Sequence, residues 1–177
     1  MIVATMNELF HSLTFYLHFN TRQKEYLKYT YLHTLTTQQQ ELNMKTLTRQ
    51  KFMVKIKEGD GIIEGYDLSG LDLSNINEAY EDYGISNITF KLCKLRETNF
   101  ENSEMIRCRY EYCDLSYANF KSSINTDSKF KYCCLLNASF HFTNISEGSI
   151  INCEMERIHG FEYACKNGMQ FIGSAYL

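Results

Sequence analysis

The sequence has neither proline nor tryptophan among its 177 residues. Proline makes up about 5% of an average protein and cannot donate a backbone hydrogen bond. Its absence indicates a body in which nearly every N–H group joins a hydrogen-bonded ladder. A strong charge is also lacking, because the formal net charge is −3, whereas a general nucleic-acid binder carries a large basic excess. With 44% hydrophobic residues, the chain is too apolar to be disordered.

The first twenty residues lack the features of a classical signal peptide. They have no basic start and no small-residue cleavage site, and polar residues such as Glu8 and His11 interrupt the apolar run. The run is also too broken for a membrane span, so an amphipathic or buried helix is the better interpretation. Seven cysteines without a signal peptide fit a reducing compartment better than a disulfide framework.

Glycine and cysteine are absent from residues 1–57, and all nine glycines and seven cysteines follow. The same boundary divides the charge, with +5 on residues 1–57 and −8 on residues 58–177. We therefore predict a helical, basic N-terminal region over 1–57, serving as a cap or leader, and a second domain over 58–177. Apolar residues four apart, as at Leu9 and Leu13, predict helices, whereas the apolar/basic alternation of 51–57 predicts a strand.

The second domain repeats with a period of five residues. From Tyr80 to Met155, an apolar residue stands at every fifth position except Asn125. The position two residues earlier is small in all thirteen cases from Cys93 to Cys153. Chance would produce such a series with odds on the order of one in ten million. This period belongs to neither a helix nor an ordinary strand.

Residues twenty positions apart also match in type, as Phe100, Phe120 and Phe140 show. Four units of five would close one square coil, and successive coils would stack roughly 4.8 Å apart. The large residue would fill the axis and the small one would lie where the backbone turns. We expect the following core residues: Leu95, Phe100, Phe120, Phe130, Leu135, Phe140, Cys93, Cys113, Cys133 and Cys153.

Units such as Leu71-Asp-Leu-Ser-Asn and Cys113-Asp-Leu-Ser-Tyr resemble the A(D/N)LXX unit of the pentapeptide-repeat family. The resemblance covers roughly residues 61–177 and implies the family fold. The predicted class is thus an all-β solenoid, a right-handed quadrilateral β-helix, preceded by a short α-helical region. We expect two interruptions: a two-residue bulge between Leu73 and Tyr80, and a one-residue slip of register after Met155.

Motifs for catalysis are missing, including G-x-S-x-G, the P-loop and H-E-x-x-H. We therefore expect no enzyme, no cofactor and no small-molecule substrate. The four cysteines spaced by twenty form a predicted cysteine column, which a metal or redox site would also use. Zinc needs ligands that converge tetrahedrally, whereas a column points its thiols side by side. We interpret the column as small hydrophobic residues and expect no metal.

Outward aromatic residues are the candidate partner-binding residues: Tyr112, Tyr132, Tyr117 and Phe142. Such rings either anchor a partner or stack between coils and cover the ladder. We expect a non-enzymatic scaffold that binds another protein, with no direct nucleic-acid binding and no membrane span. The C-terminal coil has no polar capping helix, which predicts a homodimer through that coil or a piece of a longer protein.

The resemblance implies two forms of such a scaffold. One is a bacterial effector that acts in a host cell, located in the bacterial cytoplasm or secreted by a dedicated system. The alternative is a DNA mimic that binds a type II topoisomerase such as gyrase. The acidic charge of residues 58–177 is compatible with a mimic, but interleaved basic residues such as Lys121 and Lys129 dilute it.

Overall fold

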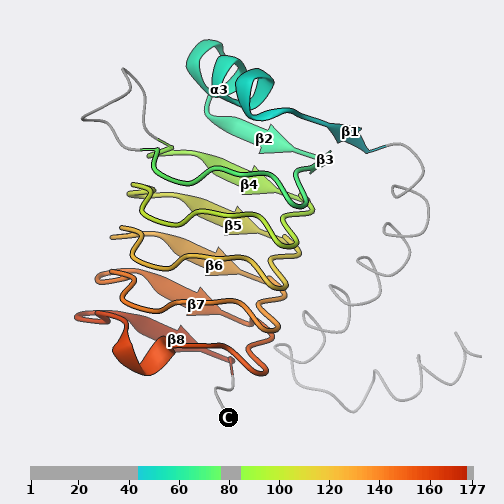
Figure 1. Ribbon diagram of the computed structural model, residues 1–177. Helices are drawn as coiled ribbons and strands as arrows, with labels where there is room; N and C mark the ends of the chain where they lie inside the picture. The colour runs from blue at the N-terminus through green and yellow to red at the C-terminus, as the bar shows by residue number, and fades with distance from the viewer. Residues whose placement is uncertain (1–43, 77–84, 175–177) are drawn as a thin grey trace, which may run out of the picture. The chain divides into compact units, whose positions relative to one another are not determined.

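The computed structural model describes residues 44–76 and 85–174. These residues fall within one compact unit, Asn43–Leu177, which is a stack of coils with each strand lying below the one before it (Figure 1). The chain winds through the stack in a right-handed sense (Figure 1), as parallel crossovers do. The helices expected near Leu9 and Leu13 lie outside the described residues.

One parallel sheet runs along the stack, and its register defines the coil. Tyr110 in one coil lies beside Phe130 in the next, so a regular coil has twenty residues. The strands, in their order in the sheet, are β2 (Ile62–Glu64), β4 (Thr89–Lys91), β5 (Arg109–Glu111), β6 (Lys129–Lys131), β7 (Ser149–Ile151) and β8 (Gln170–Ile172). We call this side of the stack the strand face.

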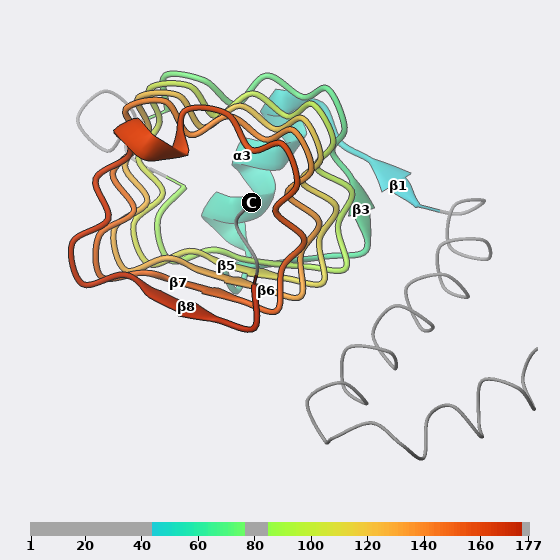
Figure 2. The same ribbon diagram turned by 90° about the horizontal axis from the view of Figure 1, so that it is seen from below.

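Three further faces complete each coil, and the end-on view is four-sided (Figure 2). They are held by isolated parallel bridges that are twenty residues apart in the regular coils. The second face contains Lys94↔Asp114, the third Asn99↔Asn119 and the fourth Ile124↔Asn144. The predicted quadrilateral β-helix is therefore confirmed.

Aromatic columns fill the axis of the stack. Tyr110 and Phe130 stack with ring centroids 4.5 Å apart, and Phe120 and Phe140 stack at 4.9 Å. The two columns meet edge to face, as between Phe120 and Phe130 at 5.8 Å. Such geometries are the favoured ones for aromatic pairs. Every large and small residue expected in the core has an exposed fraction of 5% or less.

The corners of the coil explain the missing proline. The residue two positions after the large one, such as Glu97 after Leu95, adopts a left-handed conformation with φ between 51° and 64° at the non-glycine corners. Proline cannot adopt this conformation. Asn99 Oδ1 accepts a hydrogen bond from the N–H of Glu101 at 3.1 Å, which is an Asx turn. This turn explains why Asp or Asn precedes the large residue in many units.

A helix covers the first coil. Helix α3 (Arg49–Glu58) begins after Thr48, whose hydroxyl accepts from the N–H of Lys51. Its residues Phe52 and Ile56 are buried against the core. The strand predicted over 51–57 is therefore wrong, because two apolar residues four apart pack on the coil end and outweigh the local alternation.

The solenoid unit thus begins before the boundary drawn at residue 57. Strand β1 (Lys45–Thr46) pairs in parallel with β3 (Tyr66–Asp67), so this segment is tied to the first coil. The Arg49 guanidinium donates to the carbonyls of Asp72 and Ser74 at 2.9 and 3.0 Å. These contacts place the segment from Lys45 onward in the solenoid unit.

The two expected interruptions have different outcomes. Ile63 pairs with Phe90, so the first coil exceeds the regular length by seven residues rather than two; residues 77–84 within it lie outside the described residues. The later slip is confirmed, since Ile150 pairs with Phe171 and not with the residue before it. A short 3-10 helix, η1 (Phe161–Tyr163), accommodates the extra residue.

Candidate functional site

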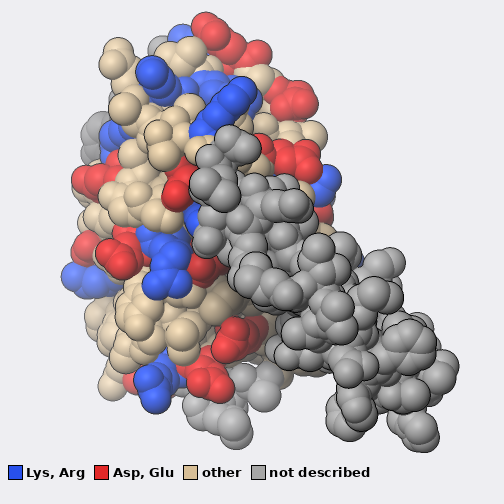
Figure 3. Space-filling model, turned by 90° about the vertical axis from the view of Figure 1, so that its right-hand side faces the viewer, with Lys and Arg blue, Asp and Glu red and all other residues tan. Residues whose placement is uncertain are grey.

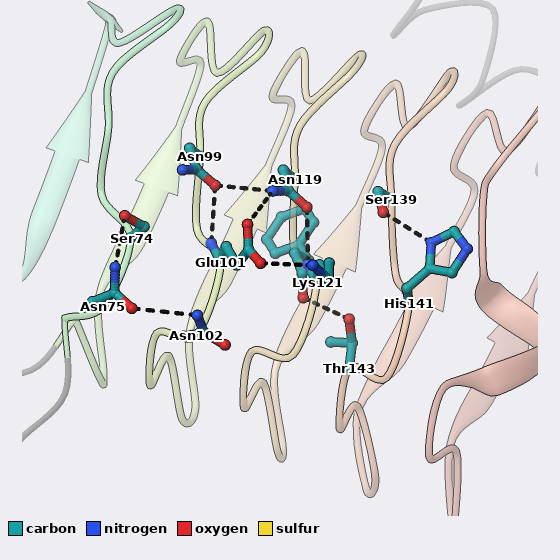
Figure 4. Close-up of polar contacts among 11 residues, drawn as sticks. Ser74, Asn75, Asn99, Glu101, Asn102, Asn119, Lys121, Ser139, His141 and Thr143 are labelled. Atoms are coloured by element: carbon teal, nitrogen blue, oxygen red, sulfur yellow. Dashed lines mark hydrogen bonds and ion pairs between the residues drawn. The ribbon is translucent and has the colours of Figure 1, made fainter.

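The third face carries a connected polar network (Figure 4). Asn119 Nδ2 donates to Asn99 Oδ1 at 3.0 Å and to Glu101 Oε2 at 3.3 Å. Lys121 Nζ pairs with Glu101 Oε1 at 2.9 Å across successive coils. Hydrogen bonding from Lys121 lowers the pKa of the Glu101 carboxyl, so this group is a poor proton acceptor at neutral pH. The network ties coils together and offers no free acid–base pair.

The cysteine column faces the interior and its thiols lie against backbone carbonyls. Cys133 Sγ donates to the carbonyl of Tyr110 at 3.3 Å. Burial raises the pKa of Cys113, Cys133 and Cys153 well above the ordinary thiol value, and that of Cys108 to about 12. The pKa of Cys93, the fourth member of the column, is instead lowered by its hydrogen bond with Cys113. All four side chains are buried in the core, where they pack as small residues. In the described ranges, no group of three or more His, Cys, Asp or Glu is placed to hold a metal ion.

The four predicted partner-binding aromatics divide into two pairs. Tyr112 and Tyr132 stack at 5.0 Å, and Tyr132 is only 4% exposed. Tyr132 is therefore not the exposed anchor that the sequence suggested, because cross-coil stacking and the Lys131 ammonium, 5.0 Å from its ring centre, cover it. Tyr117 and Phe142 do face solvent, with exposed fractions of 49% and 66%.

Phe142 belongs to a surface group that the sequence alone did not predict. Its ring lies 5.9 Å from that of Tyr163, which is 60% exposed, and the His141 ring stacks on Tyr163 at 6.1 Å. We call these three residues the aromatic cluster. Ser139 and His141 Nδ1 lie 3.2 Å apart, within hydrogen-bonding distance, on the third face (Figure 4).

Gly160 makes room for the aromatic cluster. Its φ of +68° is left-handed, and a Cβ atom built there would lie 2.2 Å from His141 Cγ. Because the glycine has no side chain, His141 can lie flat against the backbone and stack on Tyr163. Tyr163 lies within the one-residue slip, so the five-residue register gave no information on the side it faces.

Both signs of charge alternate over the surface in Figure 3. Ion pairs between coils account for part of this pattern: Lys91–Glu64 at 3.0 Å, Arg96–Asp114 at 3.3 Å and Lys121–Glu101 at 2.9 Å. The acids are therefore partly neutralised by cations one coil away. No helix in the described part of the chain is long and apolar enough to cross a membrane.

Neither a family model nor a curated protein matches this sequence. Among solved structures, it is similar to the pentapeptide repeat protein Rfr23 from the cyanobacterium Cyanothece 51142, at 13% identity and a TM-score of 0.35. That match covers 71% of this chain and 97% of Rfr23.

Two further solved structures show the same kind of likeness. Full-length QnrB1, a plasmid-mediated fluoroquinolone resistance protein, matches at 13% identity and a TM-score of 0.38, over 72% of this chain and 89% of QnrB1. A pentapeptide repeat protein from the Arabidopsis thaliana thylakoid lumen matches at 22% identity and a TM-score of 0.31, over 62% of this chain and 61% of that one. At these identities the likeness concerns the fold alone.

The described coils themselves establish the class. Five-residue units, four to a coil, stack with like residues on like, and each unit places a large and a small residue inward. The chain has the pentapeptide-repeat fold, as its sequence units predicted.

Proposed function

We propose that this chain is a non-enzymatic scaffold that binds another protein through the aromatic cluster. The observation that carries the proposal is that Phe142 and Tyr163 are 66% and 60% exposed although their rings pack together. Exposed aromatic rings on a rigid support lose little entropy on binding and are frequent anchors of protein interfaces. Pentapeptide-repeat proteins are generally scaffolds without catalytic activity, which agrees with this role.

The support under the cluster favours recognition without rearrangement. The Asn144 N–H donates to the carbonyl of Ser123 at 2.9 Å, and the Thr143 hydroxyl donates to the carbonyl of Phe120. Phe142 is therefore held at a corner whose neighbours are bonded to the coil above. A partner would meet a preformed surface and would pay little to order it.

Site-specific photocrosslinking tests this proposal. A photoreactive residue at Ser122, which lies one coil above Phe142, captures proteins from bacterial and host-cell lysates. The double variant Phe142→Ser/Tyr163→Ser should lose a protein that the unmodified surface captures, while Tyr117→Ser, at another exposed corner, should retain it. Capture of the same proteins by all three forms would contradict the proposal.

An effector that acts inside a host cell is the finer form of this proposal. A bacterial cytoplasmic location before delivery, and a host protein as the captured partner, follow from it. Recovery of the partner only from a bacterial lysate would instead favour a role within the bacterium.

The alternative is a DNA mimic that binds a type II topoisomerase. The −8 charge of residues 58–177 favours it, whereas the cross-coil pair Lys121–Glu101 and its two counterparts reduce the acidic potential. A DNA gyrase supercoiling assay separates the two proposals. If micromolar protein inhibits supercoiling and the double variant Phe142→Ser/Tyr163→Ser inhibits it equally, the mimic is favoured. If the unmodified protein does not inhibit supercoiling, the mimic is excluded.

The last coil supports a homodimer as a further partner proposal. Strand β8 pairs with β7, and no described strand covers its other edge. Phe171, in the middle of β8, is 45% exposed. Uncovered strand edges pair readily with a second copy. Light scattering should give a dimer that Phe171→Glu dissociates; a monomer at high concentration would contradict this.

A further inference from the structure

Two like charges lie side by side on the strand face. Arg109 in β5 and Lys129 in β6 are register partners in the parallel sheet, and both are exposed. Within the described ranges, neither side chain makes an ion pair or a side-chain hydrogen bond. Like charges directly opposite each other destabilise a sheet, so this pair departs from what stability alone favours.

In the neighbouring column on the same face, acidic and basic residues alternate. Glu64, Lys91, Glu111 and Lys131 succeed one another from coil to coil, so that acid and base alternate. Lys91 and Glu64 form an ion pair of 3.0 Å. This column neutralises itself, whereas the column of Arg109 and Lys129 contains no acid at all and is bounded by Thr89 and Ser149.

Lys131 adds a third positive charge to the same face, although its register partner is Glu111 and its ammonium lies 5.0 Å from the centre of the Tyr132 ring. It lies two residues after Lys129 on the same strand, and successive alternate residues of a strand share one face. We call Arg109, Lys129 and Lys131 the cationic patch. The patch has the opposite sign to residues 58–177 as a whole, which carry −8.

The core beneath the patch makes it rigid. Tyr110 and Phe130, the buried residues that follow Arg109 and precede Lys131, stack at 4.5 Å with planes only 5° apart. The side chains of the patch therefore project from strands fixed by both the ladder and the core. A binding partner would not have to order this backbone.

We propose that the cationic patch binds a short acidic peptide segment of a partner protein. Alternate residues of an extended peptide are roughly 6.6–7 Å apart, which is also the separation of Lys129 and Lys131 along their strand. Two carboxylates at alternate positions can therefore pair with these lysines, and Arg109 lies one coil, about 4.8 Å, to the side. Arginine adds a planar fork that fits a carboxylate in two hydrogen bonds.

The size of the patch selects a short segment over a nucleic acid. It spans two coils and is bounded along its column by the neutral Thr89 and Ser149. Duplex DNA carries one charge per 1.7 Å or so over its whole length. Beyond the patch, such a polymer would meet the net negative charge of the solenoid, whereas a few carboxylates would not. The surface uses other residues than the aromatic cluster and stands independently of it.

Fluorescence anisotropy with a labelled Ser-Glu-Ser-Glu-Ser-Glu peptide tests the proposal. We expect salt-dependent binding to the full chain, weakened about fivefold or more by Arg109→Gln/Lys129→Gln, since each exposed pair contributes modestly. The control Arg96→Gln/Lys121→Gln removes the same charge from other faces and should change affinity by about twofold at most. The variant Phe142→Ser/Tyr163→Ser should bind the peptide normally, so the two proposals fail separately.

Thermal melting tests whether the patch variant Arg109→Gln/Lys129→Gln is folded as stably as the unmodified chain. Because Arg109 and Lys129 repel each other, their replacement by glutamine should not lower the melting temperature. No peptide binding by the unmodified chain, or equal losses in the patch and control variants, would overturn the proposal. A phosphoserine peptide that binds tenfold more tightly, or a DNA duplex that binds as tightly, would overturn it in favour of that ligand.

Discussion

The ring of Phe52 in helix α3 lies parallel to the ring of Phe90 in β4, with centroids 6.1 Å apart and an interplanar angle of 9°. Phe90 in turn stacks on Tyr110 at 5.2 Å, so the helix adds one more ring to the core column. An open solenoid end exposes apolar side chains to water. The helix closes this end with the same aromatic stacking that joins the coils.

Removing the capping ring should destabilise the solenoid. Phe52→Ala leaves a cavity beside Phe90, and we expect a loss of about 3–5 kcal/mol in the free energy of unfolding. Urea unfolding followed by circular dichroism measures it. Val54→Ala, on the exposed side of the same helix, serves as the control and should cost less than about 1 kcal/mol. Equal losses in both variants would show that α3 does not cap the core.

Asn125 should be replaceable with a gain in stability. It occupies a large inward position, is fully buried, and its Oδ1 has no hydrogen-bond partner. Asn125→Leu removes this unsatisfied oxygen and restores the apolar series, so we expect a gain of about 1–2 kcal/mol in urea unfolding. The loss of the Nδ2 bond to Ser123 Oγ, 2.8 Å long, offsets part of it.

The matched control for Asn125 is an asparagine one coil further on. Asn144 Oδ1 accepts from the N–H of Ser146 at 3.1 Å, so Asn144→Leu removes a turn hydrogen bond. It should destabilise by about 1 kcal/mol. If Asn125→Leu also destabilises, Asn125 is required in the core, as it would be if it held a buried water.

Gly160 should tolerate alanine less well than Gly70 does. Both have left-handed φ angles, +68° in each case, so both variants carry similar backbone strain, on the order of 1 kcal/mol. At Gly70 a Cβ atom meets nothing within 4 Å, whereas at Gly160 it would lie 2.2 Å from His141 Cγ. Gly160→Ala should therefore displace His141 from Tyr163 and cost additional stability in thermal melts. Equal melting temperatures would contradict the close packing.

The five-residue period predicted the core because each inward position repeats many times. Phe120 and Cys133 lie where the register places them, and the A(D/N)LXX units correctly implied the four-sided coil. Phe52 lies outside the repeat, and its alternating neighbours resemble a strand until the coil end is present to pack against it. Local patterns do not contain such tertiary contacts.

The candidate site was predicted only in part, for the same reason. Phe142 was identified as outward from its register, but Tyr163 lies in η1, where the register breaks. The burial of Tyr132 depends on its stacking with Tyr112, which is a contact between coils rather than a property of one unit. The twenty-residue period does place Arg109 beside Lys129, but only the structure shows that both side chains are exposed.

The buried thiols should make the solenoid sensitive to alkaline pH. Burial raises the pKa of Cys108 from the ordinary 9.0 to about 12, because its thiolate would be desolvated. The folded chain therefore keeps this proton where the unfolded chain loses it. The stability linked to Cys108 is fully present below pH 9 and is lost as the pH rises toward 12.

Urea unfolding at a series of pH values from about 8 to about 11 measures this loss of unfolding free energy. Cys108→Ala should flatten the fall in stability above about pH 9, because alanine has no proton to lose. Cys165→Ala is the control, since Cys165 is exposed and forms no part of the core. It should leave the alkaline fall unchanged. If the stability of Cys108→Ala falls as steeply with pH as that of the unmodified chain, the linkage to this thiol is wrong. The other buried thiols, or Tyr110, whose pKa burial also raises, must then account for the alkaline loss of stability.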